Sequence, residues 1–254
     1  MPPGQERLGI VSVKIINDLL ITLDYGAPVR DIRLGPFWTA VLTRNCGLPS
    51  TPHAPDHHRS DFPAPVKDAG HLMGQSALGM ARMAHSDSEL EAAIGIATIN
   101  SLIEVEEARC IDLNAADLIE EQGRDKRVAI VGHFPFVERL RQTVKELWVI
   151  EQHPRESDLA ESEAQNTIPK ADVVAITGSA FVNHTIEDLL KLCEPKAFVI
   201  VLGPSTPLSS ILFDYGIDVI SGTKVIEPET VLRHVSQGAT FRQMKGVRLL
   251  TMKR

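Results

Sequence analysis

The sequence predicts an α/β protein in which a small α+β unit precedes a mostly parallel, open β-sheet with helical crossovers. The main indication is a threefold recurrence of an apolar strand, a glycine-containing polar turn and a helix. The three segments are VAIVGHFPF at 128–136, VVAITGSAFVNH at 173–184 and FVIVLGPSTPL at 198–208. Unbroken apolar runs are typical of parallel strands, which are buried on both faces and whose carboxyl ends gather ligands. We therefore expect the functional site at the sheet edge that these turns share.

Composition narrows the class of protein. The chain has 254 residues, 43% hydrophobic and 23% charged, and exceeds the roughly 100–150 residues of a common domain. A net charge of -7 without a Lys/Arg cluster disfavours nucleic acid or an acidic membrane surface as a partner. The three cysteines are far apart, and neither a signal-peptide pattern nor a membrane-spanning apolar run occurs. We expect a reduced cytoplasmic protein that could form a homo-oligomer.

The N-terminal part predicts helices around a short hairpin. Apolar spacing indicates a helix over 5–22, and two strands, VRDIRLG and PFWTAVLTR, flank the turn pair Gly35-Pro36. A proline-rich loop is expected over 45–70, followed by helices over 75–84 and 87–107. Ser86 and Glu89 have the spacing of a capping box for the second of these helices. That helix is apolar nearly all round, so it should be buried.

We interpret the charged segment 120–127 as a linker that contains the boundary between two domains, 1–123 and 124–254. After this segment, strand and helix patterns alternate. Strands are expected near 128–132, 147–151, 172–177, 198–202, 217–220 and 247–252. Helices are expected near 135–146, 182–192, 207–215 and 228–236. This alternation predicts right-handed crossovers and a parallel sheet.

The first turn, Gly132, His133, Phe134 and Pro135, lies where a dinucleotide fold places its phosphate loop. It has one glycine where that motif needs three, so NAD or FAD binding is disfavoured. His133 can face a cleft or cap the core. Glu151 ends the next strand, where an acidic residue can hold ribose hydroxyls or can be solvated.

The second and third turns offer hydroxyls and backbone amides for a polar or anionic ligand. The candidate residues are Thr177, Gly178, Ser179 and Asn183 in one turn and Gly203, Pro204, Ser205 and Thr206 in the other. A simple helix cap explains one of them but not all. Neither turn supplies a nucleophile together with its base.

Candidates in the N-terminal part are Ser50, Thr51 and Asn100. Asn100 interrupts an apolar helix, so its side chain must be hydrogen-bonded. The segment TPHAPDHHRSDF carries His53, His57 and His58, whose imidazoles suit a divalent metal ion. Its spacing matches no rigid metal motif, so an ordinary surface loop is the alternative.

Together PFWTAVLTR, GLPST, AAIGIATINSL, VGHFPF, ITGSAFVN and LGPSTPLSSILFDYGIDVISG resemble the family named putative heavy-metal chelation domain. The resemblance covers both halves. It implies an enolase-N-terminal-like domain followed by a Rossmann-like domain, with a site between them that handles metal ions or a metal-bearing small molecule. It points to the same turns, to Glu151, to the GLPST turn and to Asn100. The sequence shows no dense set of soft ligands, which heavy-metal sequestration would favour.

The function expected from the sequence is binding of a small polar or anionic ligand, one that could carry a metal, in an interdomain cleft. The sequence does not identify the cofactor, for which a divalent metal ion and a metal-bearing small molecule are the candidates. It also does not decide whether the protein is an enzyme. One alternative is a small-molecule transferase with a nucleotide-like or adenosyl cofactor, because Glu151 could hold a ribose. A second alternative is direct binding of a divalent metal by His53, His57 and His58.

Overall fold

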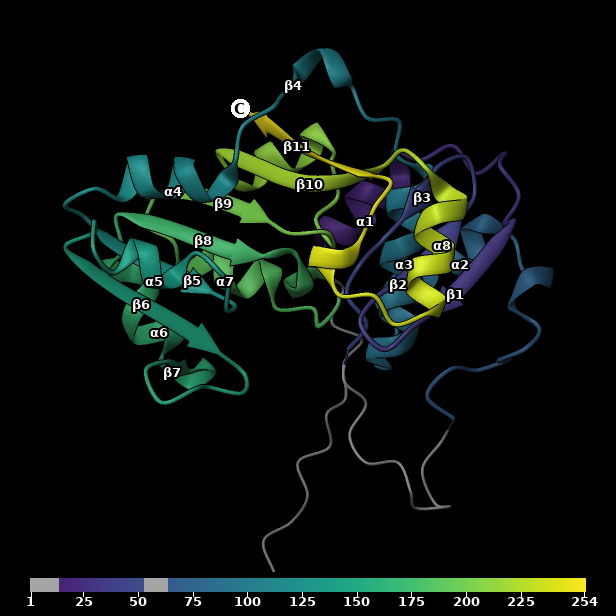
Figure 1. Cartoon of the computed structure of the whole chain (residues 1–254), viewed down its shortest axis with the longest axis horizontal. Coiled ribbons are helices and arrows are strands. Elements are labelled where there is room, and N and C mark those ends of the chain that lie inside the picture. The colour runs from purple at the N-terminus through teal and green to yellow at the C-terminus, as the bar shows by residue number, and fades with distance from the viewer. Residues whose placement is uncertain (1–13, 53–63) are drawn as a thin grey trace, which may run out of the picture.

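An eight-stranded sheet forms the larger part of the protein in the computed structural model, which describes residues 14–52 and 64–254 (Figure 1). Its order is β4-β11-β10-β9-β8-β5-β6-β7. Strands β5 to β10 run parallel, whereas β11 pairs antiparallel with β10 and β4 antiparallel with β11. The bounds are β4 Cys110–Ile111, β5 Arg127–Val131, β6 Glu146–Glu151, β7 Leu159–Ala160, β8 Val173–Thr177, β9 Phe198–Leu202, β10 Val219–Val225 and β11 Val247–Lys253. The predicted mostly parallel α/β fold is confirmed.

The direction of chain progression reverses beside β5. From β5 the chain continues to β6 and β7 on one side, then returns to β8 on the other side and proceeds to β9 and β10. In open parallel sheets, such a reversal leaves a crevice at the carboxyl ends of the two strands, where ligands bind. The turns after β5 and β8 border this position.

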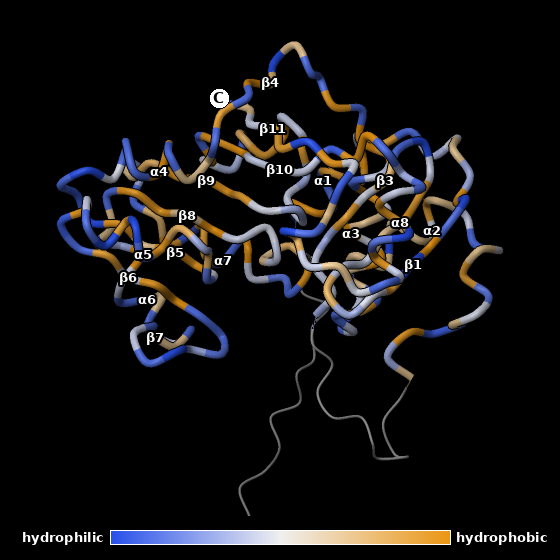
Figure 2. The backbone as a smooth tube through the Cα atoms, in the orientation of Figure 1, coloured by the Kyte–Doolittle hydropathy of each residue, from blue (hydrophilic) through white to orange (hydrophobic). Residues whose placement is uncertain are grey.

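Helices cover both faces of the large sheet because its strands are apolar on both sides. Helices α4 (Ala115–Gly123) and α5 (Val137–Leu140) pack on one face, against Val128 and Ile130 among others. Helices α1 (Lys14–Ile21), α6 (Ala164–Thr167) and α7 (Ile186–Leu192) pack on the other face, where Ala129 lies. Alternate residues of β5 thus serve opposite layers. The hydropathy colouring shows these strands as apolar segments inside polar turns (Figure 2).

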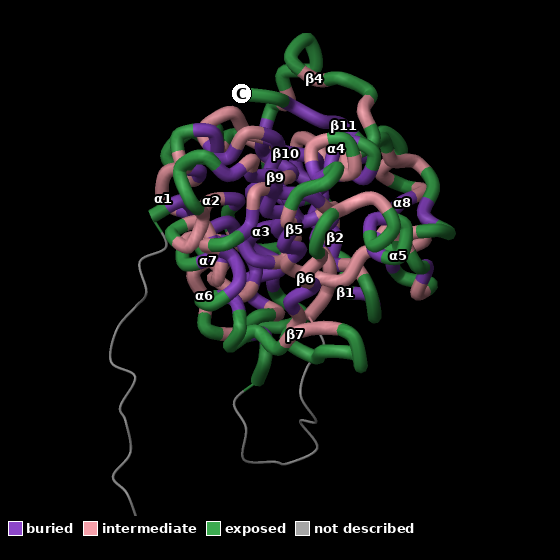
Figure 3. The backbone as a smooth tube through the Cα atoms, turned by 90° about the vertical axis from the view of Figure 1, so that its left-hand side faces the viewer, coloured by how far each residue is buried: buried purple, intermediate pink, exposed green. Residues whose placement is uncertain are grey.

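A three-stranded antiparallel sheet lies beside the large one, formed by β1 (Asp31–Leu34), β2 (Thr39–Leu42) and β3 (Cys46–Gly47). It packs on α3 (Glu89–Leu102), which is buried over most of its length as predicted and lies in the interior in Figure 3. Helix α2 (Ala77–Arg82) covers α3. A Cβ on Gly47 would lie 2.0 Å from the carbonyl oxygen of Ala97, so glycine permits this close approach of β3 to α3.

Two helices, one early and one late in the described chain, each pack on the sheet that most of their half of the chain does not form. Helix α1, near the N-terminus, packs on the large sheet, with Ile15, Ile16 and Leu19 fully buried. Helix α8 (Pro228–Ser236) instead packs on the small sheet, where Val231 and Val235 join the core around β2 and β3. This exchange ties the two sheets together.

Some predicted elements differ from the structure for local reasons. Helix α3 begins after Ser88, not Ser86, because the Ser86 hydroxyl donates to the carboxylate of the buried Glu91 at 2.5 Å. The predicted linker at 120–127 is helical as far as Gly123 and β-strand from Arg127. The helices expected at 135–146 and 207–215 shrink to α5 and to a 3-10 helix at Ser210–Tyr215, and a two-residue strand, β3, lies in the predicted loop. Residues 5–13 of the first predicted helix are outside the described residues.

Candidate functional site

Three turns meet at the carboxyl edge of the large sheet, as the sequence predicts, because β9, β8 and β5 are adjacent and parallel. Gly132 and Gly203 have φ angles of 101° and 116°, which side-chain-bearing residues rarely adopt. Gly178 permits contact between two of the turns: a Cβ there would lie 2.5 Å from both the backbone nitrogen and the hydroxyl of Thr206. The turn sequences therefore fit this meeting of backbones.

A cluster of three serines joins the turns to the small sheet. The hydroxyl of Ser50 lies 2.9 Å from that of Ser179 and 3.2 Å from that of Ser205. The backbone N–H of Ser50 also donates to the Ser205 hydroxyl at 3.0 Å. Asn100 of α3 donates its side-chain amide to the backbone carbonyl of Ser205 at 3.2 Å. Four sequence-predicted residues therefore form one hydrogen-bonded contact between the N-terminal segment and the sheet.

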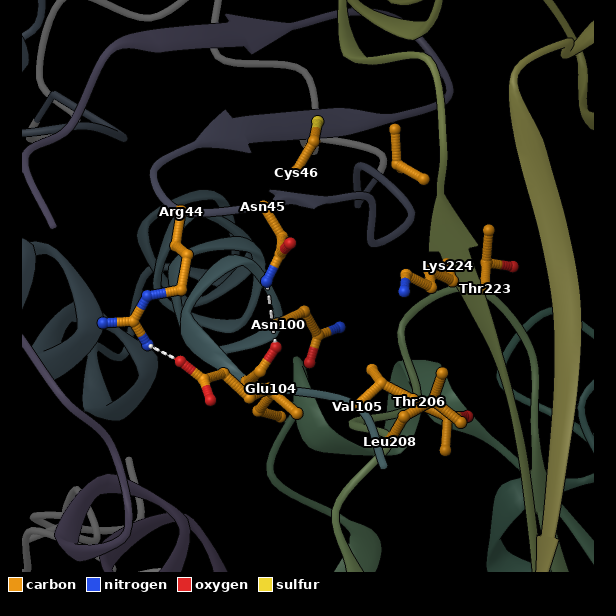
Figure 4. A pocket seen from close by; sticks show the side chains of 12 residues that line it. Arg44, Asn45, Cys46, Asn100, Glu104, Val105, Thr206, Leu208, Thr223 and Lys224 are labelled. Atoms are coloured by element: carbon orange, nitrogen blue, oxygen red, sulfur yellow. Dashed lines mark hydrogen bonds and ion pairs between the residues drawn. The ribbon is translucent and has the colours of Figure 1, made fainter. Parts of the chain in front are cut away.

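Next to this contact lies a cavity of about 250 Å³, here named the α3–β10 cavity (Figure 4). Its walls come from the segment after β2, the end of α3 and the strand β10, so it lies between the small-sheet part and the large sheet. The lining residues are Arg44, Asn45, Cys46, Asn100, Ile103, Glu104, Val105, Thr206, Leu208, Thr223, Lys224 and Val225. Of the predicted site residues, Asn100 and Thr206 line it.

The α3–β10 cavity has unpartnered polar atoms in its walls. The side-chain oxygens of Asn100, Thr206 and Thr223 are buried and have no hydrogen-bond partner among the described residues. Thr206 as a whole is only 2% exposed. Leaving a buried polar atom unpaired costs about 1–3 kcal/mol, so a ligand or an ordered water that reaches these atoms would gain stabilisation.

The charged side chains of this cavity are already engaged. Arg44 forms an ion pair with Glu104 at 2.9 Å, and its guanidinium also contacts Asp24. Lys224 contacts the carboxylate of Glu107, whose pKa is lowered by this hydrogen bond. An anionic ligand would have to displace these carboxylates, whereas a neutral ligand with O–H or N–H donors would not.

A second cavity, here named the strand-end cavity, lies at the reversal point beside β5 and has a volume of about 260 Å³. It is lined by Val131, Gly132, His133, Phe134, Ile150, Glu151, Gln152, Glu161, Thr177, Ser179, Asn183, Thr185 and Leu189. Seven of the predicted site residues line it: Gly132, His133, Phe134, Glu151, Thr177, Ser179 and Asn183. It shares no lining residue with the α3–β10 cavity. The predicted residues that line a cavity are thus divided between two cavities, and Ser179 of the serine cluster lines the second.

His133 is held by a residue that the sequence did not single out. Its Nδ1 lies 3.2 Å from the carboxylate of Asp158, whose side chain is fully buried. Asp158 also accepts from the backbone N–H of Arg155 at 3.2 Å, and its other carboxylate oxygen has no partner among the described residues. If Nδ1–H donates to Asp158, the remaining ring nitrogen is an acceptor. Asp158 comes from the irregular connection between β6 and β7, which carries no periodic pattern.

The other predicted residues support the edge without lining either cavity. They are Pro135, Gly178, Gly203, Pro204, Ser205, Ser50 and Thr51. The Thr51 hydroxyl lies 2.9 Å from that of Thr39, which secures the segment that carries Ser50. Thr177 accepts from the backbone N–H of Ser179 and is thus partly a cap. His53, His57 and His58 are outside the described residues.

Direct ligation of a metal ion does not fit the described side chains. Over residues 14–52 and 64–254, no group of three or more His, Cys, Asp or Glu side chains is arranged to hold a metal. Cys46 lines the α3–β10 cavity, but burial raises the pKa of its thiol to about 12. A thiol loses its proton when it binds a metal, so the raised pKa weakens metal binding by Cys46 near neutral pH. No helix within the described ranges is long and apolar enough to cross a membrane.

Comparison with known families agrees with this architecture. Residues 114–253 match the DUF364 family model and residues 16–103 match the DUF4213 model, both described as "Putative heavy-metal chelation". The chain belongs to the DUF364 family. An uncharacterized protein of Methanocaldococcus jannaschii is 28% identical over 173 residues, which cover 65% of this chain and 66% of that protein.

Two crystal structures of family members with unknown function share the fold. The protein from Desulfitobacterium hafniense superposes with a TM-score of 0.83 at 24% identity, covering 95% of this chain and 98% of that one. The protein from Pyrococcus horikoshii gives a TM-score of 0.78 at 19% identity, covering 97% and 100%. At these identities the likeness concerns the fold alone.

Proposed function

We propose that this protein binds a small polar molecule in the α3–β10 cavity, between the N-terminal segment and the large sheet. One observation carries the proposal: three of the five buried side-chain atoms without a hydrogen-bond partner in the described chain belong to residues of this wall, Asn100, Thr206 and Thr223. The serine cluster beside the cavity holds its two walls together.

The chemistry of the walls favours a neutral ligand rich in hydrogen-bond donors. The amide oxygen of Asn100 can only accept, and the hydroxyls of Thr206 and Thr223 can accept or donate. Ile103, Val105, Leu208 and Val225 add an apolar surface. At about 250 Å³ the cavity is below the roughly 300–1,000 Å³ of drug-sized sites, so its ligand is small.

The family description concerns heavy-metal chelation, and we propose that any metal reaches this cavity within an organic ligand. In support, no group of three or more His, Cys, Asp or Glu side chains in the described chain is arranged to hold a metal, and Cys46 favours its protonated form. We also propose a cytoplasmic location, which the free cysteines Cys46, Cys110 and Cys193 support, because disulfides are rare in reducing compartments.

The substitution Thr206→Val tests the ligand site, with Thr98→Val as the matched control. Valine keeps the shape of threonine but lacks the hydroxyl. Thr98 is fully buried in α3, where it donates to the Ile94 carbonyl at 2.8 Å, and it does not line the cavity. Native mass spectrometry of untagged protein would detect a copurifying molecule, and a thermal-shift panel of sugars, polyols and amides would detect binding directly.

We expect Thr206→Val to abolish the bound mass or the thermal shift and to raise the stability of the ligand-free protein by about 1 kcal/mol, since it removes an unpaired buried hydroxyl. Thr98→Val should keep binding and lower stability, because a satisfied hydrogen bond is lost. Retention of the ligand by Thr206→Val with unchanged affinity would exclude the α3–β10 cavity as its site.

A further inference from the structure

A second cavity borders the serine cluster at Ser179, and its carboxylates, unlike the charged side chains of the α3–β10 cavity, are not paired with cations. The strand-end cavity occupies the reversal point beside β5, at the carboxyl ends of β5, β6 and β8. Its position is the one where open parallel sheets bind ligands, and it is independent of the α3–β10 cavity because no residue lines both.

Two carboxylates without partners line this cavity. Glu151 ends β6, and Glu161 follows Ala160, the residue that pairs with Glu151 across the parallel strands β6 and β7. Neither side chain forms an ion pair or a hydrogen bond with any described residue. Of the described residues in the lining, none is a lysine or an arginine. The cavity is therefore acidic, and an anionic ligand would meet two uncompensated negative charges.

The remaining polar side chains of the lining are neutral: Gln152, Thr177, Ser179, Asn183 and Thr185 can donate as well as accept, and His133 adds an acceptor. His133 is fixed by the buried carboxylate of Asp158, so the tautomer that donates Nδ1–H leaves Nε2 as an acceptor. Nε2 makes no hydrogen bond with a described residue and is not a buried unpaired atom, so it remains accessible. The Asn183 side-chain oxygen is already used by Thr185 at 2.8 Å. A ligand thus meets Glu151, Glu161 and a preorganised imidazole nitrogen.

An aromatic ring completes the environment. Phe134 lines the cavity and is stacked on Phe136, with ring centroids 5.1 Å apart and an interplanar angle of 14°. The face of an aromatic ring attracts cations, and a ring fixed by stacking needs little rearrangement to receive one. Phe134 also occupies space next to Gly132, where a dinucleotide would need room for its phosphates.

We propose that the strand-end cavity binds an organic cation, an amine or quaternary ammonium compound, through Glu151, Glu161 and Phe134, with His133 accepting from its N–H or O–H groups. A carboxylate pair with an aromatic face is suited to such a ligand because the charge is compensated and the alkyl part is covered. Val131, Ile150 and Leu189 supply the apolar cover.

Titration of the full chain with putrescine, agmatine, spermidine and choline tests the proposal, with 3,3-dimethylbutanol as the neutral analogue of choline and citrate as the anion. We expect at least one amine to bind, and the double variant Glu151→Gln with Glu161→Gln to weaken it roughly tenfold or more, as expected for loss of charged hydrogen-bond acceptors. Both side chains are partly exposed or exposed, so the variant should fold.

The control is Glu156→Gln with Glu163→Gln, which removes the same charge from exposed neighbours outside the lining. It should bind the amine with unchanged affinity. Thr206→Val should do so too, which separates this proposal from the function proposed for the α3–β10 cavity. The proposal is overturned if no amine binds, if the double variant binds as well as the wild type, if citrate or the neutral analogue binds equally, or if only Zn²⁺ or Mg²⁺ binds.

Discussion

The hydroxyl groups of Ser50 and Ser179 lie 2.9 Å apart although the residues are separated by 129 positions in the sequence. Ser50 follows the small sheet and forms an isolated bridge with Trp38, and Ser179 is the second residue of the turn after β8. Ser179 lines the strand-end cavity, and Ser50 also contacts Ser205, the neighbour of the α3–β10 lining residue Thr206. The hydroxyl contact between Ser50 and Ser179 therefore joins the strand-end cavity to the segment that borders the α3–β10 cavity.

The first prediction concerns the coupling within this cluster. We expect Ser50→Ala and Ser179→Ala each to lower the free energy of unfolding by about 0.5–1.5 kcal/mol, because each removes a part-buried hydrogen bond. The double variant should cost less than the sum, since both changes remove the same contact. Urea denaturation measures the four members of the cycle. The control is Ser157→Ala, at an exposed residue that accepts a hydrogen bond from Arg141. Its change in free energy of unfolding should simply add to that of Ser50→Ala. If the changes for Ser50→Ala and Ser179→Ala were fully additive, the contact between the two hydroxyls would contribute nothing.

The second prediction concerns the backbone contact at Gly178. A methyl group there would lie 2.5 Å from the backbone nitrogen of Thr206, so one of the two turns must move. We expect Gly178→Ala to destabilise the protein by about 1–3 kcal/mol and to weaken ligand binding in the α3–β10 cavity. Gly74→Ala is the control, because nothing lies within 4 Å of its added Cβ. Equal melting temperatures for the two variants would contradict the close contact.

The large sheet could be predicted because its strands are buried on both faces and therefore appear as apolar runs. Strands β5, β8 and β9 are all found within one residue of the expected bounds. The short helices could not be predicted well, since α5 has only four residues and the segment after Ser209 is a 3-10 helix. The start of α3 depends on Glu91, which also accepts from the backbone N–H of Lys67 at 2.7 Å. This tertiary contact has no local sequence pattern.

The site could be predicted only where residues lie at the carboxyl ends of strands or in the turns that follow. Glu151 and Thr177 are the last residues of β6 and β8, Ser179 follows in the next turn, and all three line one cavity. Thr223 was missed because β10 continues to Val225, beyond its predicted end at residue 220. Asp158 was missed because only the folding of an irregular loop brings it to His133. That the turns open into two cavities depends on side-chain packing between the sheets, which the sequence pattern does not contain.

The third prediction concerns thiol chemistry. Burial raises the pKa of both Cys46 and Cys193 to about 12, so both thiols stay protonated near neutral pH. Cys110 is less buried than these two thiols. Its partial burial and the negative charge of Glu107 raise its pKa. We expect iodoacetamide to alkylate Cys110 first, because the thiolate is the nucleophile. Peptide mass spectrometry of the native protein measures the order, and in denaturant all three should react alike. Faster labelling of Cys46 in the native protein would contradict its buried, protonated state.

The fourth prediction concerns acid stability through the pair of Asp172 and Arg127. The Arg127 side chain and backbone N–H donate to the Asp172 carboxylate at 3.0 to 3.1 Å, which lowers its pKa from 3.8 to about 2. Because the pKa of Asp172 is lower in the folded state than in the unfolded state, its charge stabilises the fold fully at pH values above the unfolded pKa of 3.8. This stabilisation is lost as the pH falls from about 4 to about 2. The two side chains are 40% and 34% exposed, so solvent screening limits the contribution to about 1 kcal/mol or less.

The variant Asp172→Asn isolates this contribution. Other carboxylates titrate in the same range, so the measured quantity is the difference in free energy of unfolding between wild type and variant, followed by urea denaturation from pH about 5 to pH about 2.5. We expect the difference to shrink towards the acid end, because protonated Asp172 then resembles asparagine. Asp188→Asn removes the exposed pair with Lys191, and there the difference should stay near zero. A difference for Asp172→Asn that is constant with pH would mean that its carboxylate does not stabilise the fold through its charge.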